Sequence, residues 1–152
     1  MSRDYLFVFI QFVLFALYCA NFEILPGTLP GFLGLEYACY IFGAIGILVI
    51  IFGVLNLNEN LTPFPTPKKK SNLISNGIYT YVRHPIYIGI TIVLIAYAFY
   101  SESTERLIIA AVLHFVFWSK SRVEEQLLIE KFPHYKEYSE RTGRFLPRCN
   151  RK

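Results

Sequence analysis

The chain has 152 residues, of which 54% are hydrophobic and 17% aromatic, and its mean hydropathy is +0.39. This composition excludes an ordinary soluble domain, and the apolar residues lie in blocks of about the 20 residues that a bilayer crossing requires. The net charge of +4 comes mostly from the second half, and no basic patch interleaved with aromatic residues lies on a soluble module, so we exclude nucleic-acid binding.

The first half of the chain contains two predicted membrane spans. Residues 5–25 are apolar except for a few polar side chains, Gln11 among them, and end at a proline. After a short loop rich in glycine and proline, residues 35–55 form the second predicted span. Small residues on a span let a neighbouring helix approach closely. On the second span these are Gly43, Gly46 and Gly53.

Residues 56–84 form the first long polar segment, in which alternating prolines force an extended course before three consecutive lysines. A proline-rich linker is one interpretation. Aromatic residues are unusual in linkers, however, and this segment contains Phe64, Tyr79 and Tyr81. We therefore expect an ordered loop that folds back over the membrane face, with a turn at Asn76-Gly77.

Residues 85–100 and 106–119 are the third and fourth predicted spans, and each is short for a bilayer. Because only five residues join them, we predict a tight helical hairpin. Its second arm contains no helix breaker before Pro133, so it is expected to continue past Trp118 into the cytosol as an amphipathic helix. A short helix that ends near Gly143 should follow.

Lysine and arginine are concentrated in the loop 56–84 and in the tail 120–152, whereas the other two loops carry only Arg106. By the positive-inside rule, both basic segments face the cytoplasm. The sequence therefore predicts an all-α, multi-pass integral membrane protein, with a single domain over residues 1–152, four transmembrane helices and both termini cytoplasmic.

The junction between the polar loop and the third span carries Arg83-His84-Pro85. Pro85 suits the first turn of a helix, and the residue before a proline avoids the helical region, so His84 is expected at the helix cap. Free N–H groups, a guanidinium and an imidazole would then converge on a site for an anion or a ligand carboxylate. The alternative is that Arg83 anchors the helix at the lipid headgroups.

Two glutamates, Glu124 and Glu125, follow the fourth span. Such a pair on a helix that leaves the membrane is often only a solvated face. Here the short hairpin should bring both carboxylates to the level of Arg83, His84 and Tyr87. Charges of both signs beside aromatic rings and a helix N-terminus would suit a zwitterionic ligand.

Two separate motifs resemble those of the isoprenylcysteine carboxyl methyltransferase family. The first runs from Leu73 to Gly89 and includes Arg83-His84-Pro85. The second comprises Glu124-Glu125, Leu128, Phe132, Tyr135, Tyr138, Arg141 and Pro147. The resemblance covers residues 60–147 and does not extend to the first two spans. The same region is similar to phosphatidylethanolamine N-methyltransferases as well.

This resemblance implies an S-adenosylmethionine-dependent methyltransferase whose cytoplasmic site is built from the membrane-exit helices and the tail rather than from a Rossmann fold. The residues that we assign to the cofactor are Tyr79, Arg83, His84, Tyr87, Glu124, Glu125, Tyr135 and Tyr138. Cationic groups would receive its carboxylate, one of the two glutamates its ammonium or ribose, and tyrosine faces its sulfonium or adenine.

Arg141 resembles the family arginine near the methyl acceptor and is our candidate catalytic residue, although a contact with headgroups is the alternative. We expect a lipid-like acceptor and favour carboxylate O-methylation of the isoprenylcysteine type, because Arg141 and Arg144 suit an acidic group. Phospholipid or amine N-methylation, or a non-catalytic membrane adaptor, are the alternatives. The sequence indicates no obligate protein partner, and its three cysteines lack the spacing of a metal or disulfide site.

Overall fold

The structure is a computed structural model that describes residues 2–20, 29 and 34–148. The described residues form five α-helices, which are α1 (Ser2–Cys19), α2 (Leu35–Leu57), α3 (Pro85–Tyr100), α4 (Thr104–Lys131) and α5 (Tyr135–Arg141). Two short 3₁₀ turns, Asn58–Asn60 and Gly77–Thr80, lie between α2 and α3. Within these residues there is no strand, and an isolated parallel bridge joins Val82 to Gly143. The predicted all-α class is thus confirmed.

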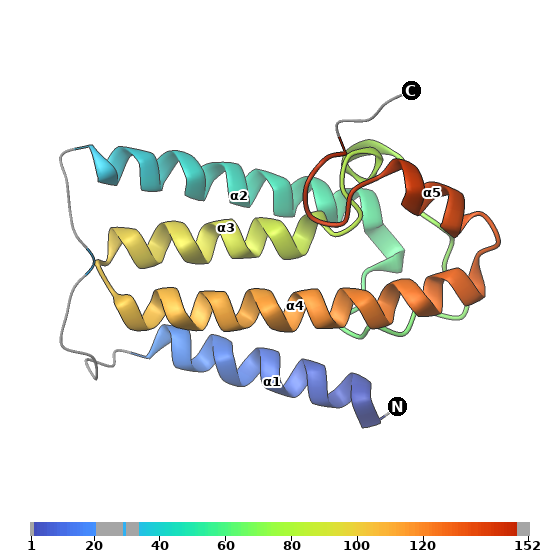
Figure 1. The fold of residues 1–152 in the computed structure, drawn as a ribbon, viewed down its shortest axis with the longest axis horizontal. Coiled ribbons are helices and arrows are strands. Elements are labelled where there is room, and N and C mark those ends of the chain that lie inside the picture. The colour runs from blue at the N-terminus through green and yellow to red at the C-terminus, as the bar shows by residue number, and fades with distance from the viewer. Residues whose placement is uncertain (1, 21–28, 30–33, 149–152) are drawn as a thin grey trace.

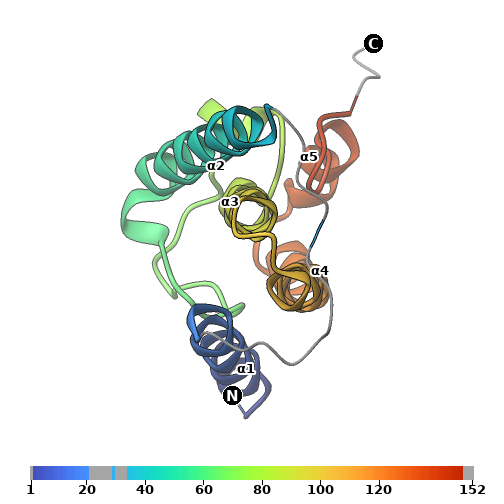
Figure 2. The same ribbon diagram turned by 90° about the vertical axis from the view of Figure 1, so that its left-hand side faces the viewer.

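Four long helices run side by side, with the loop between α2 and α3, the helix α5 and the described end of the tail gathered at one end (Figure 1). The end-on view shows α3 between α2 and α4, and α1 packed against α4 (Figure 2). The predicted hairpin is confirmed: α3 spans Pro85–Tyr100, and α4 continues without a break from Thr104 to Lys131.

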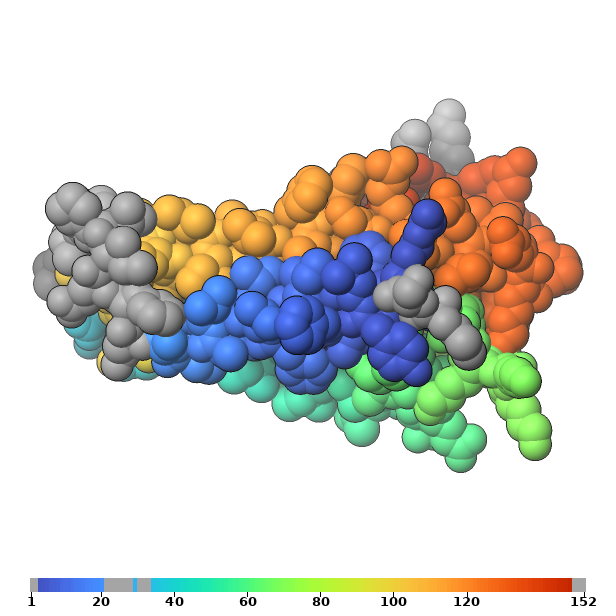
Figure 3. Space-filling model, turned by 90° about the horizontal axis from the view of Figure 1, so that it is seen from below, coloured from blue at the N-terminus to red at the C-terminus, as the bar shows by residue number. Residues whose placement is uncertain are grey.

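Among the described residues, one helical stretch, Leu35–Asn60, is long and apolar enough to cross a membrane, with a mean hydropathy of 2.7. The helix α3 is apolar but shorter. The helix α1 ends at Cys19, and most of the remainder of the predicted first span, 5–25, lies outside the described residues. Both α1 and α2 carry many exposed large apolar side chains, and Figure 3 shows α1 along one long face of the molecule. Four spans remain a prediction.

The helices α2 and α3 meet backbone to backbone at Gly46 and Gly89. A Cβ added to Gly46 would lie 2.8 Å from the Gly89 carbonyl oxygen, so neither glycine tolerates a side chain without a shift of the helices. A Cβ added to Gly53 would lie 2.7 Å from the Ile86 side chain, whereas nothing lies within 4 Å of a Cβ at Gly43. The predicted close approach is therefore made by two of the three glycines on α2.

The core of the bundle lies between α1, α3 and α4. Its buried members are Tyr18, Leu94, Ala110, Leu113 and Phe117. The Tyr18 hydroxyl donates to the Leu94 carbonyl oxygen at 2.5 Å, which satisfies a hydroxyl that would otherwise be buried without a partner. This contact links α1 to the hairpin and so fixes the helix that covers one side of the candidate site.

The segment between α2 and α3 is an ordered loop, as the aromatic residues predicted. The Asn56 side-chain oxygen accepts from the Ile78 N–H at 2.9 Å and holds the 3₁₀ turn against the end of α2. Gly77 begins this turn with a φ of +57°, and a Cβ there would collide with the Asn56 side chain. Phe64 packs edge-on against Tyr5 of α1, with ring centroids 5.3 Å apart. These contacts fix the position of the loop whose last residues, 82–84, directly precede α3.

Candidate active site

The conformation at the start of α3 is set by Pro85 and by hydrogen bonds from the preceding residues to Gly143 and Arg144 of the tail. Pro85 occupies the first helical turn and His84 is the N-cap, as expected. The Arg83 N–H donates to the Gly143 carbonyl oxygen at 2.9 Å, and the His84 N–H donates to the Arg144 carbonyl oxygen at 3.1 Å. The tail therefore crosses back beside the residues that precede α3, a contact that the sequence did not reveal.

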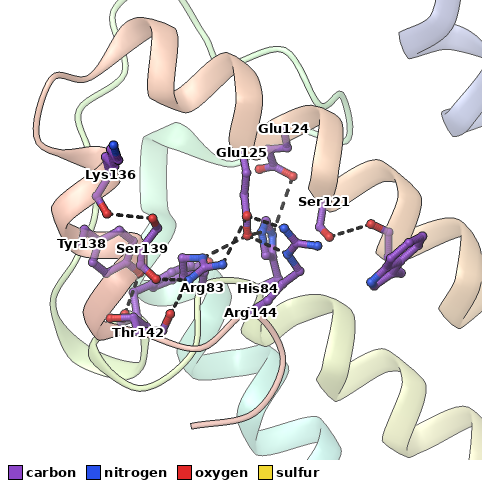
Figure 4. Close-up of polar contacts among 12 residues, drawn as sticks. Arg83, His84, Ser121, Glu124, Glu125, Lys136, Tyr138, Ser139, Thr142 and Arg144 are labelled. Carbon is purple, nitrogen blue, oxygen red and sulfur yellow. Dashed lines mark hydrogen bonds and ion pairs between the residues drawn. The ribbon is translucent and has the colours of Figure 1, made fainter. Parts of the chain in front are cut away.

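Glu125 lies at the centre of an ion-pair cluster (Figure 4). Its carboxylate accepts from Arg83 Nε at 3.0 Å, from Arg144 Nη2 at 2.6 Å, and lies 3.1 Å from His84 Nε2. Burial raises the pKa of the Glu125 carboxyl, but hydrogen bonds from His84, Arg144 and Arg83 outweigh it and hold that pKa well below its usual range. Glu125 is thus a permanent anion that joins α4 to the start of α3 and to the tail.

The Arg83 guanidinium points inward. Besides its two bonds to Glu125, its Nη1 donates to the Ser139 carbonyl oxygen at 2.7 Å and to the Thr142 carbonyl oxygen. Four of the five N–H donors of a guanidinium are therefore used within the described residues, and one is left for a ligand. This placement differs from a headgroup anchor, the alternative considered for this residue.

Glu124 lies at the edge of that cluster and contacts it through His84. Its Oε2 accepts from the Tyr87 hydroxyl at 3.0 Å and lies 3.9 Å from His84 Nδ1. The Glu124 side chain is 26% exposed, against 9% for Glu125, and it borders both of the cavities described below. Of the two adjacent glutamates, Glu124 is the one whose carboxylate is open to a ligand.

A stack of rings supports the same region. The His84 ring stacks on the Tyr87 ring with centroids 5.4 Å apart and an interplanar angle of 4°. The other neighbour of Tyr87 is Phe117 of α4, whose ring lies at 4.9 Å and 4°. Because His84 and Tyr87 are fixed by these contacts and by the glutamates, their positions relative to α4 are set before any ligand binds.

Three further tyrosines form the wall on the side of α5. The Tyr138 hydroxyl donates to the Tyr79 carbonyl oxygen at 2.7 Å, and the Tyr79 hydroxyl donates to the Gly53 carbonyl oxygen at 3.3 Å. Tyr135 packs edge-on against Tyr138, with centroids 5.7 Å apart. Burial raises the pKa of all three hydroxyls, so they remain protonated at neutral pH.

Two adjoining cavities meet at this cluster. The first, of about 90 Å³, lies between the proline-rich loop and the α4–α5 region and is bordered by Tyr135 and Tyr138. The second, of about 280 Å³, extends along α3 and α4 toward α1 and is bordered by Tyr87 and Lys120. The residues that border both are Leu57, Thr62, Tyr79, Arg83, His84 and Glu124.

Seven of the eight residues that were assigned to the cofactor border one or both cavities. The eighth, Glu125, binds the side chains of Arg83 and His84. Arg141 does not join them. Its side chain is 76% exposed, pairs with Glu137 at 2.5 Å one turn earlier on α5, and borders neither cavity. The helix ends at Arg141 and the chain turns back, so Arg144 is the arginine that reaches the cluster.

Sequence reasoning missed the pair of Lys120 and Gln11, which borders the second cavity. Lys120 Nζ donates to Gln11 Oε1 at 3.0 Å and lies 5.3 Å from the centroid of the Tyr87 ring. Lys120 is only 1% exposed. The signal was present, because Gln11 is a polar residue inside an apolar helix, but Lys120 was read only as part of the basic tail.

Comparison with known proteins assigns the family. A model of the family described as phospholipid methyltransferase matches residues 35–135, which include α2, α3 and α4. Of the cluster, these residues include Arg83, His84 and Glu125, whereas Arg144 lies beyond them. The chain belongs to the phospholipid methyltransferase family. Membership of this family implies membrane methyltransferase activity, and phospholipid methyltransferases typically use S-adenosylmethionine. The match does not distinguish the isoprenylcysteine type from N-methylating members.

Two curated proteins are similar to this chain over part of their length. The nickel-cobalt-cadmium resistance protein NccN of Alcaligenes xylosoxydans xylosoxydans is 30% identical over 84 residues, which is 55% of this chain and 39% of that protein. The cobalt-zinc-cadmium resistance protein CzcN of Cupriavidus metallidurans is 33% identical over 87 residues, with the same two coverages of 55% and 39%. The match thus spans well under half the length of either relative.

Proposed function

We propose that the protein is an S-adenosylmethionine-dependent integral membrane methyltransferase that acts on a lipid-like acceptor at the cytoplasmic face. The observation that carries this proposal is the placement of Glu124 and His84, which border two adjoining cavities at once. A transferase needs two sites that share a wall, because donor and acceptor must meet there. Family membership supplies the reaction class.

The residues around the first cavity fit the cofactor. Glu124 offers a carboxylate to an ammonium group or to ribose hydroxyls, with one oxygen already oriented by Tyr87. The remaining donor of Arg83, which also borders this cavity, suits a carboxylate. The faces of Tyr135 and Tyr138 suit an adenine ring or a sulfonium.

The cofactor, when bound, supplies a methyl group on a sulfonium to a nucleophile that approaches in line. The contribution of the chain is then mainly positional, and effects of this kind supply about 7–11 kcal/mol in well-oriented reactions. Glu125 fixes Arg83, His84 and the tail relative to α4, and the stacked rings of His84 and Tyr87 prevent the shared wall from moving. We infer that Glu125 acts by positioning, whereas Glu124 contacts the ligand.

For the acceptor we propose carboxylate O-methylation. A carboxylate is already a nucleophile, whereas an ammonium acceptor must first lose a proton to a base. N-methylation of a phospholipid amine, which the family description suggests, is the second candidate. Arg141, exposed on α5, suits a contact with an acidic headgroup at the membrane surface rather than a contact inside the cavities.

The test is methyl transfer from cofactor labelled in the methyl group to a membrane extract, followed by treatment with mild base. A carboxyl methyl ester releases its label as volatile methanol, whereas an N-methyl group is stable. We expect base-labile label with the wild type, little label with Glu124→Gln, and wild-type levels with Glu130→Gln, a change of an exposed glutamate on the same helix. Base-stable label would favour N-methylation, and the absence of transfer to any acceptor would favour the adaptor alternative.

A further inference from the structure

Lys120 is a buried cation that has few partners. Its ammonium group has three N–H donors, and the one hydrogen bond that it makes within the described residues goes to Gln11. The Tyr87 ring supplies a cation–π contact at 5.3 Å but accepts no conventional hydrogen bond. A charged group at 1% exposure is costly unless it is paired, and the side chain borders the second cavity.

The charges around the two cavities leave a place for one more anion. The cations are Arg83, Arg144, Lys120 and Lys68, and the carboxylates are Glu124 and Glu125. Burial lowers the pKa of the Lys120 ammonium, whereas the nearby Glu124 carboxylate raises it. Both arginines are bound to Glu125. A sulfonium cofactor, which rests on the proposed function, would add positive charge beside Glu124. Lys68 is exposed and donates to the Glu59 carbonyl oxygen at 2.6 Å. Glu124, the carboxylate that acts on Lys120, would then be engaged by the cofactor, which would leave the buried Lys120 without a counter-charge of its own.

The walls of the second cavity indicate what carries that anion. Apart from the polar residues already named, its lining is apolar and includes Ile86, Ile90 and Phe117 of the two hairpin helices. The helix α1 closes it through Gln11 and lies exposed along that side of the molecule (Figure 3). A cavity between helices that has both an apolar wall and charged groups in its lining suits an amphiphile.

We infer that the second cavity is the acceptor site and that Lys120 binds an oxyanion of an acidic amphiphile, either a carboxylate or a phosphate. Gln11 accepts from one of the three N–H donors of Lys120, which leaves the other two for the oxyanion. The oxyanion pairs with Lys120 beside Glu124 and His84, which border both cavities, so the acceptor lies next to the cofactor. Arg141, which the sequence suggested for this role, lies outside both cavities.

The test is calorimetric titration of three probes into the purified chain in a nonionic detergent, without cofactor and with the heat of micelle partitioning subtracted. The probes are dodecanoate, dodecyl phosphate and the uncharged methyl dodecanoate. The wild type should bind one or both anions saturably, and Lys120→Met should weaken that binding about tenfold to a hundredfold, the usual effect of losing a hydrogen bond to a charged group. Lys120→Arg should retain it.

Lys136→Met, at an exposed lysine of α5, is the matched control and should bind as the wild type does. Methyl dodecanoate should bind equally to the wild type and Lys120→Met. Dependence on Lys120 for dodecanoate identifies a carboxylate acceptor, and dependence for dodecyl phosphate alone identifies a phosphate-bearing one. If Lys120→Met does not fold, Gln11→Leu keeps the cation without its partner and should bind the anions at least as well as the wild type.

Equal anion affinity in the wild type and Lys120→Met, no saturable anion binding, or loss of binding in folded Gln11→Leu would overturn the inference. Titration of S-adenosylmethionine into the same preparations separates this result from a failure of the proposed function. Cofactor binding without Lys120-dependent anion binding would overturn the acceptor site alone. The absence of cofactor binding in every preparation, the wild type included, would overturn the proposed function.

Discussion

Replacement of Glu125 by glutamine is expected to destabilise the end of the molecule at which the tail meets α4 and the start of α3. The carboxylate makes five polar contacts, two with Arg83, two with Arg144 and one with His84. Removing one partner of a buried ion pair typically costs about 3–5 kcal/mol, because the opposite charge is left without compensation. Arg144 is 29% exposed and glutamine still accepts one hydrogen bond, so we expect a loss of about 3 kcal/mol.

The loss would be measured as the free energy of unfolding in mixed micelles titrated with dodecyl sulfate, followed by circular dichroism. Glu130→Gln is the matched control, since Glu130 is exposed and makes no ion pair with a described residue, and its change should stay within about 0.5 kcal/mol. The tail should also become more sensitive to trypsin after Arg144 in Glu125→Gln. Equal stabilities of Glu125→Gln and Glu130→Gln would refute the role of Glu125 as the anchor of the tail.

Three further outcomes follow from the structure. The pKa of Glu125 is lower in the folded chain than its unfolded value of about 4.3. The carboxylate therefore contributes fully to the free energy of unfolding above about pH 4.3, and this contribution is lost as the pH falls through the folded pKa. The difference in stability between the wild type and Glu125→Gln should thus be constant from about pH 5 to 7 and shrink below about pH 4, and a difference that grows in acid would contradict this sign. In a cysteine-free background in intact cells, cysteines at Lys70 and Lys136 should resist an impermeant maleimide while a cysteine at Glu102, in the α3–α4 turn, reacts; labelling of only one of the first two would rule out a common face. Gly46→Val should destabilise the α2–α3 contact by about 1–3 kcal/mol in the same unfolding assay, whereas Gly43→Val, which meets nothing within 4 Å, should not.

The helical hairpin could be predicted because local signals determine it. Pro85 marks the start of α3, five residues separate the two apolar stretches, and no breaker precedes Pro133, so a continuous α4 was the expected result. The same reasoning brought Glu124 and Glu125 to the level of His84, because antiparallel helices joined by a short turn must align.

The distinct roles of the two glutamates could not be predicted. Adjacent residues on a helix differ by about 100° in direction, and which of them faces the tail depends on how the tail returns. That return is made by backbone contacts of Gly143 and Arg144 with the residues before α3, and backbone groups have no signature in a sequence. For the same reason the sequence did not show that Arg144 pairs with Glu125, whereas Arg141, which the family resemblance suggested near the acceptor, lies exposed on α5.

The pair of Lys120 and Gln11 shows a different limit. The two residues are 109 positions apart, and nothing local indicates that α1 packs against α4 rather than against α2. A lone glutamine in an apolar span predicts a polar partner inside the bundle, but it does not say which one.

Direct titration of S-adenosylmethionine into the purified wild type, Glu124→Gln and Glu130→Gln tests the central claim. The wild type and Glu130→Gln should bind the cofactor with equal affinity. Glu124→Gln should bind it about tenfold to a hundredfold more weakly, as expected for the loss of a hydrogen bond to a charged group, while its stability matches that of the control. Equal affinity in Glu124→Gln and the wild type, or no binding by the folded wild type, would contradict the assignment of this site to the cofactor.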